Sequence, residues 1–316
     1  MKRPRGLTRE QRAALLRRVE AAAEPQGGVL SRDQLSALGV GHRFIAAQVG
    51  AGRWKAHGRQ TIAVHTGSLD DLGFRWRAIW EVGSSIARLD GVSALQHDGL
   101  TGYSESRVWV SVLHSHTVRP PDGVVIRKVR RRVEDESTAA GIPRARPDIA
   151  AIRGATWAVS DRQAALILVM AVQQRLTTGE RLVEASIKVR RRARRAFIHR
   201  VALDIADGAH SLGELDFAGL CRTYGIPEPT RQVVRYGPKG RVYLDAAWED
   251  IGWAVEIDGA HHCWGLTPTD DSFRQNEIML SDEKLLRMTL VGLRLEETRF
   301  MDQVARAHAR AAQRAA

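Results

Sequence analysis

The sequence predicts an α/β (α+β) fold of helices and small sheets. Apolar residues recur with helical spacing at Thr8–Glu24 and again at Asp161–Arg175. They alternate with polar residues at Arg107–Leu113 and through Arg241–Asp258, as in half-buried strands. A chain of 316 residues can hold two or three domains. We place the domains at residues 1–66, 67–207 and 208–316.

Charge and hydropathy limit the classes of function. Lys and Arg number 48 against 36 Asp and Glu, and this net charge of +12 favours a polyanionic partner, most simply nucleic acid. A basic surface that is only solvated is the alternative. The basic N-terminus has no apolar segment after it, and the longest apolar run, Ala164–Val172, is too short for a bilayer. We therefore expect a cytoplasmic protein with no membrane partner.

Residues 1–66 have the pattern of a winged helix. Ser31 is a typical N-cap for a short helix at Arg32–Leu38, and a tight glycine-containing turn leads into a second helix at His42–Val49. Helix, tight turn and helix form a helix-turn-helix. The segment Arg53–Val64 then contains two strand-like pieces, which we expect to form the wing.

The segment GGVLSRDQLSALGV, with GRWKAHGRQTIAV after it, resembles the N-terminal winged helix of AbiEi-type antitoxins, the repressors of type IV toxin–antitoxin systems. The resemblance implies that the second helix enters the major groove of DNA and that the wing contacts phosphates or the minor groove. The implied DNA-binding residues are His42, Arg43 and Gln48 on the helix, and Arg53, Lys55 and Arg59 on the wing. Trp54 is expected in the core of the wing. Winged helices also bind proteins, so a cognate toxin stays open as a partner.

The middle of the chain predicts helices and a pair of strands. Helical patterns cover Asp70–Ala87 and Val92–His97, and strand patterns cover Arg107–Leu113 and Val124–Val129. The turn formers Pro120-Pro121-Asp122-Gly123 separate the strands, so we expect an antiparallel pair. These segments also resemble the central part of AbiEi-like chains. No catalytic constellation is visible here.

A basic segment ends the middle region. Helical periodicity covers Pro147–Gly154, Asp161–Arg175 and Glu180–Asp207. The last of these contains a basic helix at 188–200 with Lys188, Arg190, Arg191, Arg192, Arg194, Arg195 and Arg200. Like charges one turn apart destabilise a helix unless something neutralises them, and a phosphate backbone would do so. We expect Lys188, Arg191, Arg192 and Arg195 to bind DNA; a solvated helix is the alternative.

An acidic hairpin organises the last third of the chain. Two strand patterns, Arg241–Ala247 and Trp253–Asp258, flank the turn formers Glu249–Gly252. A turn centred between Asp250 and Ile251 places Asp245 opposite Glu256, and alternation puts Asp258 on the same face. Facing carboxylates repel one another, so they indicate a divalent cation with oxygen ligands, Mg²⁺ or Mn²⁺. The intervening residues Val242, Leu244, Ala246, Trp253, Val255 and Ile257 then point into a core.

The pattern D-x(10)-E-x-D-G followed by His-His resembles endonuclease domains related to very-short-patch-repair (Vsr) enzymes, of the PD-(D/E)-x-K superfamily. The resemblance implies a restriction-endonuclease-like mixed sheet flanked by helices at residues 208–316. Asp245 and Glu256 match the two acids. Asp258 stands where the superfamily usually has a Lys. The resemblance leaves His262, or His261, to orient the attacking water or act as the acid.

Further residues follow from the same resemblance. Glu214 completes a helix-capping box with Ser211, and in similar domains an acid in this helix also approaches the metal; both roles stay open. Arg274 and Arg287 are candidates to stabilise a charged transition state. Related repair enzymes carry a structural zinc, for which Cys221, Cys263, His261 and His262 are conceivable ligands. Their spacing matches no CxxC pattern, so a zinc site is not favoured.

The sequence therefore predicts a metal-dependent endonuclease that binds and hydrolyses nucleic acid, expected to be double-stranded DNA. The alternative is a non-catalytic transcriptional regulator or antitoxin whose nuclease-like fold is degenerate, which the missing Lys favours. A third reading is an antitoxin whose last domain binds a toxin. Winged-helix binders are often dimers, so a homodimer is among the expected partners, although no heptad pattern is visible.

Overall fold

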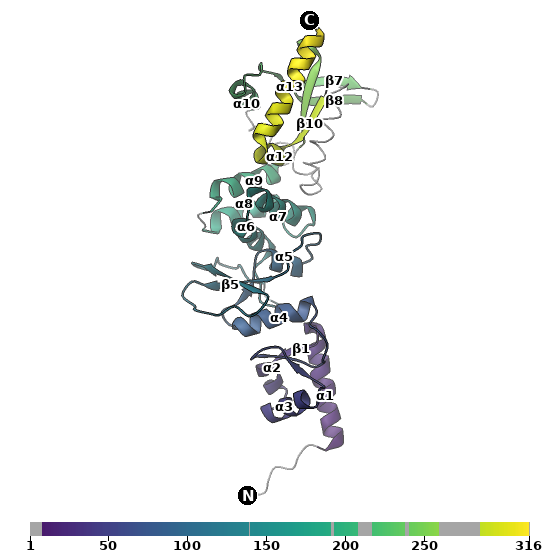
Figure 1. Ribbon diagram of the computed structural model, residues 1–316, viewed down its shortest axis with the longest axis vertical. Coiled ribbons are helices and arrows are strands. Elements are labelled where there is room, and N and C mark those ends of the chain that lie inside the picture. Colours follow the sequence, from purple (N-terminus) through teal and green to yellow (C-terminus); the bar gives the residue numbers. More distant parts are fainter. Residues whose placement is uncertain are drawn as a thin grey trace. The chain divides into compact units, whose positions relative to one another are not determined.

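The computed structural model describes residues 8–138, 140–190, 193–207, 217–237, 240–258 and 285–315. Within these, it describes no side chains at 207, 231–237, 240–245, 256, 258, 285, 287, 290 and 315. The fold is mixed α/β, as predicted (Figure 1). The chain forms two compact units, Met1–Arg146 and Pro147–Ala316. This division matches neither predicted boundary, so the three-domain organisation stays a prediction.

The first unit begins with the winged-helix order of elements. The helices are α1 (Arg9–Ala23), α2 (Arg32–Ala37) and α3 (His42–Gly50), and a 3-10 turn, η1 (Glu24–Gln26), follows α1. The strands β1 (Val29–Ser31), β2 (Lys55–Ala56) and β3 (Thr61–Ala63) form an antiparallel sheet in the order β1-β3-β2. The predicted helices and wing strands are thus confirmed to within a few residues.

Local sequence explains where these helices begin. The side chains of Thr8 and Ser31 each accept a hydrogen bond from the backbone N–H of the third helical residue, Gln11 and Gln34 respectively. In return, the side chain of that Gln accepts a bond from the backbone N–H of the cap residue. The helices pack on a core that includes Val19, Leu30, Leu35, Ile45, Trp54 and Ile62. Trp54 is 5% exposed, which confirms it as a core residue of the wing.

The rest of the first unit is a sheet covered by helices. It contains α4 (Asp71–Val82), β4 (Arg88–Leu89), α5 (Val92–His97), β5 (Val108–Leu113) and β6 (Val124–Val129), with strand order β4-β5-β6. The helix α4 ends earlier than predicted because Gly83, with φ +124°, follows it.

The predicted antiparallel pairing of β5 and β6 is wrong. The two strands pair in parallel, with Val108 opposite Val124 and Leu113 opposite Val129. The connection between them therefore carries the chain back along the sheet instead of closing a hairpin. Trp109 and Ser111, which alternate with Val110 and Val112 along β5, are buried as well. Burial on both faces is typical of parallel strands.

The second unit begins with four helices, α6 (Pro147–Trp157), α7 (Asp161–Gln173), α8 (Gly179–Lys188) and α9 (Arg195–Asp207). The apolar helix α7 is largely buried, since Ala164, Ile167, Leu168 and Ala171 are fully buried. The predicted continuous helix Glu180–Asp207 is wrong, because α8 ends at Lys188 and α9 begins at Arg195.

A four-stranded mixed sheet completes the second unit. Its strands are β7 (Thr230–Gly237), β8 (Gly240–Trp248), β9 (Trp253–Asp258) and β10 (Leu285–Thr289), and its order is β10-β9-β8-β7. Only the β9–β10 pair is parallel among these neighbours. The accompanying short elements are α10 (Phe217–Thr223), η3 (Glu249–Ile251) and α12 (Leu290–Leu295).

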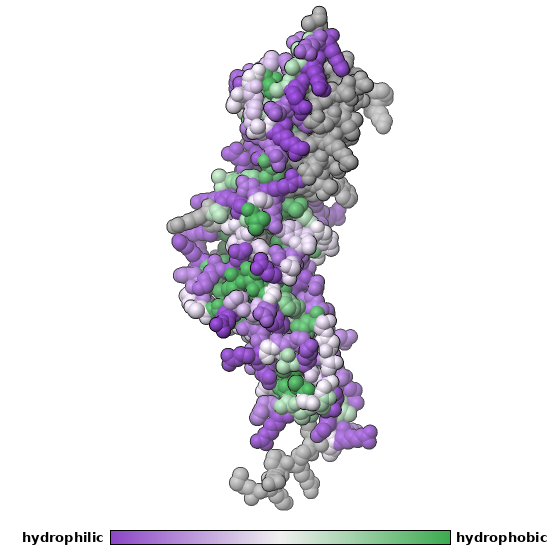
Figure 2. All heavy atoms as spheres, viewed as in Figure 1, coloured by the Kyte–Doolittle hydropathy of each residue, from purple (hydrophilic) through white to green (hydrophobic). Residues whose placement is uncertain are grey.

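The long helix α13 (Glu297–Ala315) lies alongside this sheet (Figure 1). Phe300, Met301, Val304 and Ala307 pack in one core with sheet residues such as Val255. The exposed residues of α13 include Arg299, Arg306, Arg310 and Arg314, and the helix is hydrophilic on the face shown in Figure 2. Among the residues that the structure describes, no helix is long and apolar enough to cross a membrane.

Candidate nuclease-like site and nucleic-acid surfaces

The β8–β9 hairpin has the predicted register. Ala246 pairs with Val255, Ala247 with Ala254, and Trp248 with Trp253. These three pairs have the register expected from a turn centred between Asp250 and Ile251. The predicted pair of Asp245 with Glu256 is the next one along this register and lies beyond the last of the observed pairs. The turn itself is η3, and Gly252 closes it in the left-handed region at φ +64°.

The residues predicted to point into the core are buried where the structure describes them, but Ala247 and Ala254 on the opposite face are buried as well. Ala246, Trp248, Trp253, Val255 and Ile257 are all buried in one cluster. The rings of Trp248 and Trp253 stack with centroids 4.8 Å apart, and Trp248 Nε1 donates a hydrogen bond of 2.7 Å to the Pro227 carbonyl. The side chains of Val242 and Leu244 lie outside the described ones.

The opposite side of the hairpin is defined by register alone, because the side chains of Asp245, Glu256 and Asp258 are outside the described set. Strand alternation assigns the three carboxylates to the face opposite Ala246 and Val255. The parallel neighbour β10 pairs Arg287 with Glu256 and Thr289 with Asp258. Leu286 and Met288, the neighbours of Arg287 along β10, are in the core.

Several predicted site residues fall outside the described part of the chain. These are Glu214, His261, His262, Cys263 and Arg274. Within the described part, no group of three or more His, Cys, Asp or Glu side chains could hold a metal ion. The side chains of Asp245, Glu256 and Asp258 are not among those described, so the predicted Mg²⁺ or Mn²⁺ site stays a prediction.

Cys221 is a core residue. It lies on α10, fully buried among Phe217, Ile226 and Phe300. Burial raises the pKa of its thiol to about 12. Because metals bind the thiolate, this cysteine is poorly suited as a zinc ligand in the folded chain.

The helix-turn-helix presents some of the predicted DNA-binding residues. His42 and Arg43, at the start of α3, are exposed, as are Arg53, Lys55 and Arg59 on the wing. Gln48 is a correction: it is 3% exposed, and its Oε1 accepts a hydrogen bond of 2.6 Å from Arg53 Nε. In this conformation Gln48 orders the start of the wing and cannot read a base.

The loop between β2 and β3 is held by one carboxylate. Glu81, on α4, accepts hydrogen bonds from the backbone N–H groups of Arg59, Gln60 and Thr61 at 2.8, 2.8 and 2.9 Å, and from the Thr61 hydroxyl at 2.8 Å. From the same helix, Arg77 Nε donates to the His57 carbonyl at 2.7 Å. Burial, together with the cations Lys55 and Arg77, lowers the pKa of His57.

The basic segment includes the end of α8 and the start of α9. Val189 is extended, and Arg194 adopts φ +53°, in the left-handed region. Lys188, Arg190, Arg195 and Arg200 are exposed, while Arg194 Nε bonds Asp161 Oδ1 at 2.5 Å. Arg191 and Arg192 lie outside the described residues.

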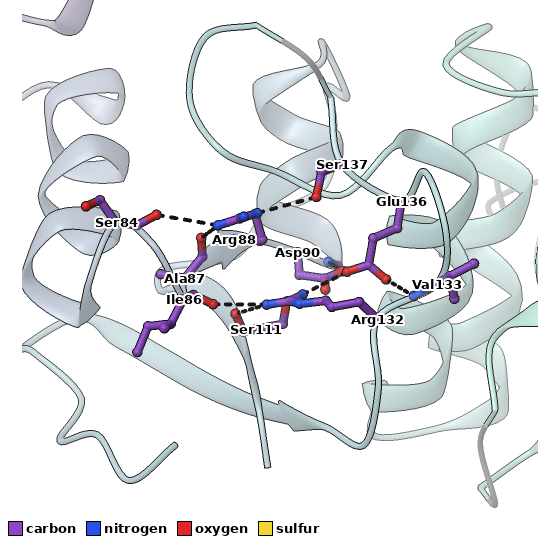
Figure 3. Close-up of polar contacts among 11 residues, drawn as sticks. Ser84, Ile86, Ala87, Arg88, Asp90, Ser111, Arg132, Val133, Glu136 and Ser137 are labelled. Carbon is purple, nitrogen blue, oxygen red and sulfur yellow. Dashed lines mark hydrogen bonds and ion pairs between the residues drawn. The ribbon is translucent and has the colours of Figure 1, made fainter. Parts of the chain in front are cut away.

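One buried polar cluster was missed by the sequence prediction (Figure 3). Arg132 binds Ser111 Oγ at 2.7 Å, the Ser111 carbonyl at 2.9 Å and the Ile86 carbonyl at 3.1 Å, and it pairs with Glu136 at 2.9 Å. Glu136 is 3% exposed and also accepts a bond from the Val133 amide. From its residues alone, this segment is a charged loop, and nothing in the pattern distinguishes a buried carboxylate from a solvated one.

The comparisons with known proteins give no functional assignment. No protein family matches the chain, and no curated protein matches it in sequence. Among solved structures, the RV2827C protein from Mycobacterium tuberculosis is similar with a TM-score of 0.38 and 18% identity, over 59% of this chain and 76% of that chain. A likeness of this size supports no functional inference.

Proposed function

We propose that this protein binds double-stranded DNA in the cytoplasm and hydrolyses its phosphodiester bonds with a divalent metal ion. The observation that carries the proposal is the hairpin register, in which Ala246 pairs with Val255. Continued by one residue on each strand, this register would pair Asp245 with Glu256, as the sequence predicts. Facing carboxylates in a ladder are destabilising unless a cation compensates them.

The sequence predicts Asp245, Glu256 and Asp258 on one face of the hairpin, here called the acidic face. Its donor atoms suit a hard cation. Asp245, Glu256 and Asp258 offer only carboxylate oxygens, which Mg²⁺ and Mn²⁺ prefer. Such an ion activates water and neutralises the leaving oxygen of a phosphodiester. The register neighbour Arg287 is suited to stabilise negative charge on the phosphate.

DNA binding is supported by exposed cations on two parts of the chain. The winged-helix region offers Arg43, Lys55 and Arg59, and the basic segment offers Lys188 and Arg195. Contacts of this kind go to phosphates, so we expect the affinity for duplex DNA to fall steeply as salt rises.

The experiment compares plasmid and mismatched-duplex cleavage by the native protein, Asp245→Ala and Asp250→Ala, with and without Mg²⁺ or Mn²⁺. Asp250 is a matched control because it is an exposed carboxylate in the turn of the same hairpin. We expect metal-dependent nicking by the native protein and Asp250→Ala, and cleavage at background level by Asp245→Ala. Metal-dependent nicking retained in Asp245→Ala would contradict the site.

The alternative function is a non-catalytic regulator or antitoxin of a type IV system. The observation that favours it is Asp258 at the position where related nucleases carry the water-orienting Lys. In that case all three proteins bind duplex DNA in a salt-sensitive manner and none cleaves it. A bound toxin or a homodimer would then be sought next.

A further inference from the structure

The loop between β2 and β3, here called the wing loop, is held by a side chain of the helix α4. Three successive amides, those of Arg59, Gln60 and Thr61, donate to the two oxygens of one carboxylate, Glu81. The Thr61 hydroxyl adds a fourth bond. Hydrogen bonds to a charged acceptor are stronger than neutral ones, so these four bonds to Glu81 fix the loop more firmly than a turn of the same length could by itself.

Gly58 shows that the loop and the carboxylate fit closely. Its φ is +134°, and a Cβ at this position would lie 2.4 Å from the Glu81 carboxyl carbon. A side chain here would displace the carboxylate and strain the backbone. The loop sequence and the acid on α4 are therefore matched to each other.

The loop is also held by two arginines. Arg32 Nε, at the start of α2, donates to the Arg59 carbonyl at 2.7 Å, and Arg77 Nε donates to the His57 carbonyl at 2.7 Å. Arg77 reaches further, to the Asp122 carbonyl at 3.0 Å, before β6. The wing is thus tied both to the helix-turn-helix and to the sheet of the same unit.

We propose that Glu81 is a positioning residue for duplex binding: it holds the wing loop so that Lys55 and Arg59 meet the phosphate backbone in one fixed arrangement. The inference rests on the proposed DNA binding by the wing. The contacts of Arg59 described above are made by its backbone, so its exposed side chain is available to face a ligand. Pre-organising the loop lowers the ordering cost of binding.

The first measurement is amide hydrogen exchange in the full chain. Glu81→Ala removes the carboxylate that accepts the loop's hydrogen bonds. In Gly58→Ala the added methyl group would displace that carboxylate. Both variants should speed exchange at Arg59, Gln60 and Thr61. Arg59→Ala should leave the exchange of Gln60 and Thr61 unchanged, because it removes no acceptor. Unchanged exchange in Glu81→Ala would overturn the inference.

The second measurement is affinity for a random-sequence duplex as a function of salt. Arg59→Ala should lower the salt slope by about one, as for the loss of one phosphate contact. Glu81→Ala should lower it by at least as much, and the double variant should lose less than the sum. Thr61→Val removes only the hydroxyl bond, and should give a smaller loss in a protein with an unchanged thermal melt.

The outcomes separate the inference from the function on which it rests. Native protein that binds no duplex at low salt would overturn the proposed function, and the inference with it. Native binding with no effect of Glu81→Ala, although its loop exchanges faster, would overturn the inference alone. Native binding with no effect of Arg59→Ala would likewise show that the wing loop is not a phosphate contact.

Discussion

At the residue scale, Glu136 illustrates what one carboxylate can do in an arginine-rich stretch. It is buried, pairs with Arg132 and caps the Val133 amide, so it fixes the loop after β6 against the sheet. Spacing could not have revealed this, because the loop is not helical and its neighbours Glu134 and Asp135 are exposed. Burial, which depends on tertiary structure, distinguishes Glu136 from them.

Glu136→Ala should lower the free energy of unfolding by about 3 kcal/mol, because it leaves the partly buried Arg132 without its carboxylate. Glu134→Ala, a matched change on the same loop, should alter stability by less than about 0.5 kcal/mol. Urea unfolding of the three proteins measures both values. Replacing the pair together, Arg132→Met with Glu136→Leu, should recover part of the loss. Equal effects of the two single changes would contradict this role.

Cys221 gives a prediction about pH. Its folded pKa of about 12 lies above that of an unfolded thiol, which is about 8.5. The fold therefore favours the protonated thiol, and this contribution is complete below about pH 8.5 and is lost as pH rises toward 12.

In a Cys263→Ser background, the melting temperature should therefore fall more steeply between about pH 9 and pH 12 when Cys221 is present than when it is Ala. Thermal melts across this range test the difference. Iodoacetamide should also label Cys221 slowly in the native protein at neutral pH. Parallel pH profiles for the two proteins would contradict the buried thiol.

At the scale of elements, local sequence predicted most of what the structure contains. Capping boxes set the start of α1 and α2, and a four-residue turn set the register of the β8–β9 hairpin. The pairing of β5 with β6 could not be predicted, because turn formers between two strands are compatible with a hairpin or with a return crossover. In the structure the two strands pair in parallel, and both faces of β5 are buried.

For the candidate site too, local pattern predicts only which residues share a face of a strand. The two-residue period of the strands assigned Asp245, Glu256 and Asp258 to one face, and the observed register agrees with that assignment. Gln48 failed as a DNA-binding residue because helical position alone does not tell an exposed side chain from one that turns inward to bond Arg53. Glu81 was missed for a related reason: its partners are distant in sequence and are backbone amides.

At the scale of the whole molecule, the net charge of +12 is informative only through its distribution. A uniformly basic surface would bind polyanions through its total charge, and any three arginines would be equivalent. A phosphate-binding surface instead depends on particular cations held near one another. The basic segment is such a concentration, since Lys188, Arg190 and Arg195 are all exposed there.

Replacing Lys188, Arg190 and Arg195 together by Gln should reduce the salt slope of duplex binding by about three, the number of phosphate contacts removed. The matched control replaces Arg107, Arg119 and Arg131 by Gln, because these are exposed arginines of the first unit and the net charge falls equally. The control should lose less than about one unit of slope. Titrations of a random-sequence duplex between about 50 mM and 200 mM salt provide the slopes. Equal losses in the two triple variants would mean that total charge alone attracts the DNA, and that the basic segment is a solvated surface.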